Sequence, residues 1–166
     1  MSIVALLIFP LLMAYAASSD LLTMRISNRI VLLLIASFFV VAWIVGLTLA
    51  DIGMALLAAG IVLVVAFAFF AFGWIGGGDA KLVAATTLWL GFGLTLPYLV
   101  YAALLGGGLT LLILAVRRWP LPETLSRIRW IDRLHDSKGG IPYGIALAAA
   151  GLLVYSDTSI YQRLLG

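Results

Sequence analysis

Two aspartates, Asp20 and Asp79, have the residue type and the setting that hydrolytic chemistry requires. Asp20 directly follows the apolar segment 1–19, and Asp79 directly follows the glycine run 76–78. Ionisable groups beside an apolar phase are costly, so each one calls for a structural or chemical reason. Two carboxylates held close together share one proton: the ionised group can take a proton from water while the protonated group donates to a carbonyl oxygen. Such a pair needs neither a metal ion nor a cysteine.

Simpler explanations exist for both aspartates. An aspartate that follows glycines at the start of a helix is typical of a helix cap, which would explain Asp79. An aspartate at the end of an apolar segment with Arg25 nearby is typical of an interfacial ion pair, which would explain Asp20. The same two residues would also suit a proton relay in a small transporter or channel subunit, or a structural subunit without chemistry. Spacing alone leaves these alternatives open.

The composition indicates a protein that uses the lipid bilayer as its solvent. Hydrophobic residues make up 64% of the 166 residues, charged residues 10%, and the mean hydropathy is +1.21. The sequence has no cysteine and one histidine, which argues against a thiolate or imidazole metal site. We therefore expect no metal and no cofactor, with membrane lipids and no nucleic acid among the partners.

Uncharged segments predict an all-α fold with six transmembrane helices in a single domain, residues 1–166. A spanning helix needs about 20 mostly apolar residues. The segment 82–116 is too long for one span, and Gly91, Gly93 and Pro97 indicate where it is interrupted. We expect the first segment to be retained as a span and not removed as a signal peptide. The predicted spans are 1–19, 30–50, 52–78, two within 82–116, and 139–156.

The positions of the basic residues predict the orientation of these spans. Every lysine and arginine except Arg163 falls on one side of the predicted membrane. By the positive-inside rule that side is cytoplasmic, so both termini face outward. Apolar residues recur at helical spacing within Arg117–Lys138, with charged residues between them. We expect this segment to form an amphipathic helix that lies in the cytoplasmic membrane interface.

Three sequence elements resemble those of the type IV prepilin peptidases, a class of intramembrane aspartyl proteases. Gly76-Gly77-Gly78-Asp79 resembles the G-x-G-D signature of that class. Asp20 with the downstream Ile26-Ser27-Asn28 resembles the first aspartate and its Ile-Pro-Asn element, although Ser27 stands where proline is common. Ile141-Pro142-Tyr143-Gly144 resembles the Pro-Tyr-Gly that opens the last span. The resemblance implies that Asp20 and Asp79 are the catalytic pair.

The resemblance also implies a substrate and a location. The substrate would be a prepilin whose short basic leader is cut at the cytoplasmic face of the bacterial inner membrane, just before its apolar helix. Larger members of the class carry a cysteine-rich insertion and also methylate the new N-terminus. This chain has no cysteine and a short loop after its first span, so it resembles the compact form that serves tight-adherence (Flp-type) pili. Such an enzyme is expected to cleave without methylating. The oligomeric state stays open.

Several further residues are candidates for supporting the site. The glycines Gly76 and Gly78 would shape the loop before Asp79. Lys81 would shift the pKa of the carboxylate pair or hold a substrate carbonyl. The alternative is a lysine that only anchors the helix at the membrane interface. Asn28 would hydrogen-bond the loop or cap the second span. The small-residue face near residues 106–108 would receive the apolar helix of the substrate. The remaining candidates, expected to line the site, are Pro142, Tyr143 and Gly144.

Overall fold

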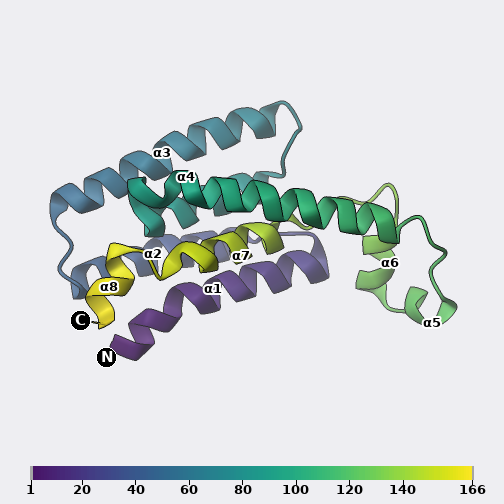
Figure 1. Ribbon diagram of the computed structural model, residues 1–166, viewed down its shortest axis with the longest axis horizontal. Coiled ribbons are helices and arrows are strands. Elements are labelled where there is room, and N and C mark those ends of the chain that lie inside the picture. Colours follow the sequence, from purple (N-terminus) through teal and green to yellow (C-terminus); the bar gives the residue numbers. More distant parts are fainter. Residues whose placement is uncertain (1, 166) are drawn as a thin grey trace.

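The computed structural model describes residues 2–165, and within them the chain forms helices joined by short loops, with no strand. The long helix α4 lies between α3 on one side and α1, α2 and α7 on the other (Figure 1). The small helix α6 packs against the ends of α1 and α4. The helices are α1 (Ser2–Thr23), α2 (Asn28–Ile44), α3 (Leu49–Ala71), α4 (Gly77–Val116), α5 (Glu123–Ser126), α6 (Arg129–His135), α7 (Tyr143–Tyr155) and α8 (Ser159–Leu165).

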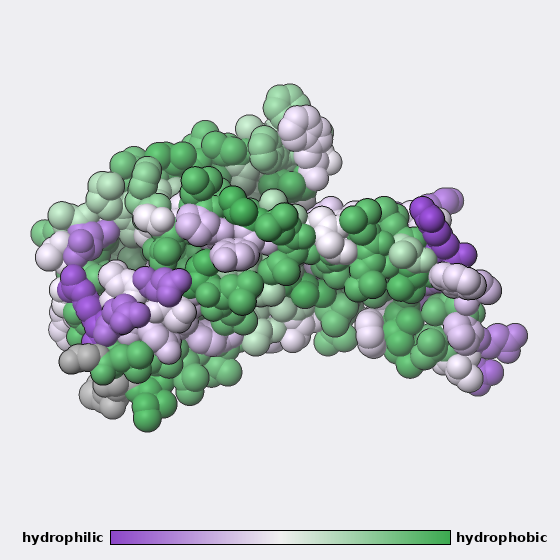
Figure 2. Space-filling model, viewed as in Figure 1, coloured by the Kyte–Doolittle hydropathy of each residue, from purple (hydrophilic) through white to green (hydrophobic). Residues whose placement is uncertain are grey.

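Apolar side chains cover most of the surface, as expected for a membrane protein. Figure 2 shows continuous hydrophobic surface along the helices and hydrophilic residues gathered at the two ends of the molecule. Helices α1, α3 and α4 are long and apolar enough to cross a bilayer, and α7 with α8 adds a fourth span if this bent pair is counted as one. Helix α2 is apolar, but its 17 residues are fewer than the roughly 20 that a spanning helix needs. Helix length and composition therefore support three or four of the six predicted spans.

The predicted interruption of 82–116 is confirmed, and it lies at Gly91. This residue has φ 72° and ψ 177° inside α4, so the helix is divided into a first half, 77–90, and a second half, 92–116. Pro97 does not interrupt the helix and lies within the second half. A proline in a membrane helix is tolerated where neighbouring groups satisfy the freed backbone carbonyl. The reversal at Gly91 returns the second half alongside the first.

Substituting Gly91 by alanine should destabilise the fold without any steric clash. A Cβ atom at Gly91 would meet nothing within 4 Å, but the positive φ with ψ near 180° is a region that only glycine adopts readily. We expect Gly91→Ala to lower the free energy of unfolding by about 1–3 kcal/mol. Thermal unfolding of the purified protein in detergent measures this. Gly93→Ala is the matched control, because Gly93 lies in helical backbone with open space around it. Equal unfolding midpoints for the two variants would contradict this account.

The first half of α4 occupies the centre of the molecule. Trp89 is buried at 2% exposure, and its ring packs 5.3 Å from that of Phe9 in α1, measured between centroids. Its indole Nε1 donates a hydrogen bond of 2.9 Å to the carbonyl oxygen of Leu34 in α2. The ring of Phe9 also stacks on that of Tyr155 in α7 at 4.7 Å. These contacts fix the first half of α4 against α1 and α2, with α7 packed on the other side of Phe9.

The segment 117–138 forms two short helices, α5 and α6, so the prediction of an amphipathic helix here is not confirmed. Two prolines precede α5, and Ile128 has extended backbone (φ −91°, ψ 105°) that separates α5 from α6. Arg117 ties the segment to α4 by hydrogen bonds to the carbonyl oxygens of Leu134 (2.8 Å) and Gly140 (3.0 Å). Location of this segment in the membrane interface stays a prediction.

Candidate active site

Asp20 lies in the last turn of α1 and is almost fully buried, with 6% of its surface exposed. Its Oδ2 accepts a hydrogen bond of 2.7 Å from the backbone N–H of Gly144, in the first turn of α7. A buried carboxylate needs such partners, because an unpaired polar group in the interior is costly. The start of the last long helix therefore fixes the orientation of this side chain.

Gly144 must be a glycine because α7 approaches Asp20 so closely. A Cβ atom built on Gly144 would lie 2.8 Å from Asp20 Oδ2, 2.9 Å from Asp20 Cβ and 3.0 Å from Cδ1 of Ile26. These separations are shorter than van der Waals contact allows. Any side chain at this position would displace the carboxylate or the loop between α1 and α2.

Asp79 lies in the first turn of α4, and its side chain is partly buried. The helix is preceded by Gly76, whose backbone is extended and which offers no side-chain cap. A Cβ atom on Gly76 would lie 2.8 Å from Asp79 Oδ2, so the carboxylate folds back over the start of its own helix. A Cβ atom on Gly78 would lie 3.2 Å from Cβ of Ile26, so this glycine allows α4 to pack against the α1–α2 loop. The glycine run thus shapes the surroundings of Asp79.

Asp20 and Asp79 line one polar cavity of about 470 Å³. Its other walls are the α1–α2 loop, residues 24–27, Asn28 at the start of α2, and the glycines 76–78. Two ionised carboxylates that line one cavity repel each other. Both lie at helix ends, one in the last turn of α1 and the other in the first turn of α4. A proton relay, which requires carboxylates near the middle of the spans, is not supported by these positions.

The sequence profile of the type IV leader peptidase family matches residues 7–111, which include both aspartates and all of the glycine run. The chain belongs to the type IV leader peptidase family. Membership implies a protease of the leader-peptidase type with a prepilin as its substrate. No curated protein and no solved structure matches the chain significantly. The element 141–144 lies outside the matched residues, yet it reaches the site through the bond from Gly144 to Asp20.

Lys81 and Asn28 of the peptidase contact each other beside the site. Lys81 Nζ donates a hydrogen bond of 3.0 Å to Asn28 Oδ1, which joins the first turns of α4 and α2. Asn28 does not cap α2, because Ser27 is the capping residue and its hydroxyl accepts a bond from the N–H of Ile30. Serine is therefore well suited to the position where proline was expected.

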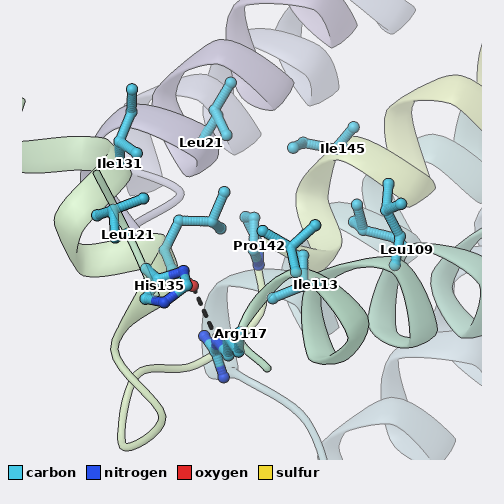
Figure 3. Close-up of a pocket in the computed structure, with 12 residues that line it drawn as sticks. Leu21, Leu109, Ile113, Arg117, Leu121, Ile131, His135, Pro142 and Ile145 are labelled. Atoms are coloured by element: carbon cyan, nitrogen blue, oxygen red, sulfur yellow. Dashed lines mark hydrogen bonds between the residues drawn. The ribbon is translucent and has the colours of Figure 1, made fainter. Parts of the chain in front are cut away.

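Pro142 and Tyr143 lie at the start of α7, but their side chains contact different parts of the molecule. Pro142 is buried and lines an apolar cavity with Ile113 and His135, apart from the two aspartates (Figure 3). Tyr143 shares a hydrogen bond of 3.0 Å with Thr110 and packs 3.3 Å from the position of a Cβ on Gly106. Helix α7 thus already covers the Gly106 end of the small-residue face that was expected to receive the substrate.

Ile26, in the α1–α2 loop, lies at the centre of the site, which the sequence did not predict. Its side chain lies against both Gly78 and Gly144. Gly78 is in α4, which carries Asp79, and Gly144 is in α7, which contacts Asp20. Met24, two residues earlier, has a positive φ of 54°, which is rare for a residue other than glycine. The available signal for Ile26 was an apolar residue between two polar ones, Arg25 and Ser27.

Proposed function

We propose that this peptidase is an intramembrane aspartyl endopeptidase that removes the basic leader of Flp-like type IV prepilins, with Asp20 and Asp79 as its catalytic pair. The observation that carries the proposal is the polar cavity, which both carboxylates line from the ends of two different helices. The sequence match to leader peptidases supports the protease class and the prepilin substrate.

In the proposed reaction, a water molecule attacks the carbonyl carbon of the scissile peptide bond. The ionised carboxylate takes a proton from this water as the new C–O bond forms, and the protonated carboxyl donates its proton to the carbonyl oxygen. When the tetrahedral intermediate collapses, the newly ionised carboxylate takes a proton from one of its hydroxyl groups, the C–N bond breaks, and the other carboxyl gives its proton to the leaving amine. The pair then again holds one proton. The bond from Gly144 to Asp20 holds one of the two carboxyl groups in place during these steps.

We further propose that the apolar segments form six spans with both termini outside and the site at the cytoplasmic face of the inner membrane. The six spans are α1, α2, α3, the two halves of α4, and α7 with α8. The start of α1 and the end of α8 lie at the same end of the molecule, opposite α5 and α6 (Figure 1), which agrees with an even number of crossings. Basic residues flank the end that carries the aspartates, as the positive-inside rule requires.

Cleavage without methylation is part of the proposal. The loop between α1 and α2 has room for only a few residues, 24–27, and the sequence has no cysteine with which to build a metal-bound insertion. Methyl transfer would need a site for a methyl donor. We assign the polar cavity to hydrolysis and therefore not to a methyl donor. The leader is attracted to the two carboxylates, while the arginine-rich segment 117–138 contacts anionic lipids.

Coexpression with a tagged prepilin from the same genome tests this function. We expect the peptidase to shorten the precursor by its leader and to leave an unmodified amino group at the new N-terminus. Intact-mass and N-terminal peptide analysis of the purified pilin measure both results. Cells that carry the prepilin alone are the control. A precursor that keeps its leader would overturn the proposed protease, and a methylated N-terminus would overturn the narrower claim of a non-methylating enzyme.

A further inference from the structure

A second, apolar cavity adjoins the site on the side away from α1 and α2. We call it the α3–α4 groove, and its volume is about 600 Å³. Helix α3 forms one wall and the second half of α4 the other, while the first half of α4 and α7 form the floor. Its lining residues are Ile61, Val62, Val65, Ala66, Phe69, Trp74, Ile75, Asp79, Val83, Thr95, Leu99, Tyr143 and Leu147.

Asp79 lines both the α3–α4 groove and the polar cavity, so the two spaces meet at its carboxylate. Among the described residues, it is the only acidic or basic side chain that lines the groove. The hydroxyl of Thr95 is bonded to the carbonyl oxygen of Gly91 at 2.8 Å, and that of Tyr143 is bonded to Thr110 at 3.0 Å. The groove therefore presents apolar surface that ends at one catalytic carboxylate.

We propose that the α3–α4 groove binds the apolar helix of the prepilin, on the carboxyl side of the bond that is cut. This inference rests on the proposed function, because it uses Asp79 as a catalytic residue. A prepilin changes from a basic leader to an apolar helix at its cleavage point. In the peptidase, the polar cavity and the apolar groove likewise adjoin each other at Asp79. A substrate with its scissile bond at Asp79 places the leader in the polar cavity and the helix in the groove.

The shape of the groove suits one face of a helix. Its α3 wall runs from Ile61 to Phe69, which corresponds to roughly two helical turns, about 12 Å. A bound helix would contribute side chains at i, i+3, i+4 and i+7 to this length. Ala66 on the wall has a small side chain, which leaves room in the groove. Val65 is half exposed along the open side, so an apolar helix can enter the groove laterally from the lipid.

Cysteine cross-linking tests the occupant directly, because the sequence contains no native cysteine. Val65→Cys places a thiol in the groove, and Val64→Cys places one on the neighbouring exposed face of α3 that lines none of the cavities described here. Both are made with Asp20→Asn, which keeps the substrate whole and leaves the groove unchanged. They are coexpressed with tagged prepilins that carry single cysteines along the apolar helix. We expect oxidation to link Val65→Cys to one helical face of the prepilin and not to link Val64→Cys.

Filling the groove in the otherwise intact enzyme provides the second measurement. Val65→Trp should slow leader removal about tenfold, because the larger side chain occupies space that the bound helix needs. Val64→Trp should leave the rate within a factor of about two, since its side chain lies outside the groove on the exposed face of α3. Rates are compared at equal amounts of membrane-inserted enzyme.

The outcomes separate this inference from the proposed function. Prepilin processed normally by the parent enzyme, with no cross-link at Val65→Cys above the Val64→Cys background, would overturn the groove and leave the protease standing. Linkage of Val65→Cys to a second copy of the peptidase would also overturn the groove as the prepilin site. An unchanged rate of leader removal in Val65→Trp would overturn it too, because the groove would then hold lipid and not the substrate. A prepilin that is cross-linked at Val65→Cys but never processed by the parent enzyme would support the groove and refute the protease.

Discussion

Replacing Asp20 or Asp79 by asparagine should lower the rate of leader removal by on the order of 10³-fold or more. Asparagine keeps the size of each side chain, but it can neither accept the proton of the attacking water nor supply one to the carbonyl oxygen. In the proposed mechanism the two carboxylates, which line one cavity, share the proton transfers, so loss of either one would stop the reaction. The measurement is the initial rate of prepilin processing by purified enzyme in detergent or liposomes.

Asp51→Asn is a matched control for these variants. Asp51 is also an aspartate in the first turn of a helix, and it pairs with Arg163 at 3.4 Å and with the N–H of Thr48, far from the polar cavity. We expect this variant to keep the normal processing rate and to insert normally into membranes. If Asp20→Asn or Asp79→Asn processed prepilin as fast as Asp51→Asn, the two-aspartate mechanism would be wrong.

Substituting Gly144 by alanine should reduce processing by about 100-fold while the protein still inserts and folds. The added methyl group would lie 2.8 Å from Asp20 Oδ2, and the carboxylate must move to relieve the contact. A displacement of about 1 Å at a reacting group can cost on the order of 10²-fold in rate. The measurement is the processing rate, normalised to the amount of folded enzyme that thermal unfolding reports.

Gly140→Ala provides the control for the Gly144 variant. Gly140 lies four residues earlier, and a Cβ atom there would meet nothing within 4 Å. We expect Gly140→Ala to process prepilin at nearly the normal rate. A Gly144→Ala enzyme of normal activity would show that the contact between α7 and Asp20 does not position the carboxylate, and the role of the last long helix in the site would have to be abandoned.

The sequence predicted those features of the fold that depend on local pattern. Apolar runs predicted the helical membrane protein, and the glycines around Gly91 predicted the interruption of the long apolar segment. The glycines before Asp79 were expected to shape the loop at that point, and in the structure Gly78 lies against Ile26. Local pattern suffices here because glycine, proline and charge each act on their own segment of chain.

Features that depend on packing between distant segments could not be predicted in the same way. The hydrogen bond from Gly144 to Asp20 joins residues 124 positions apart, and the sequence gives no measure of how closely those helices approach. The α3–α4 groove exists because the second half of α4 folds back at Gly91, so its walls come from segments that no periodicity connects. The pairing of Lys81 with Asn28, in place of contact with the aspartates, likewise follows from the packing of α4 against α2.

Asp20 and Asp79 are proposed to act as one catalytic unit, and the double variant Asp20→Asn/Asp79→Asn tests this most directly. Residues that act together in one step show strongly non-additive effects on rate. We therefore predict that the double variant processes prepilin at the same residual rate as either single variant, when purified enzymes are compared in one membrane preparation. A double variant whose loss of rate equals the product of the two single losses would contradict the shared catalytic pair.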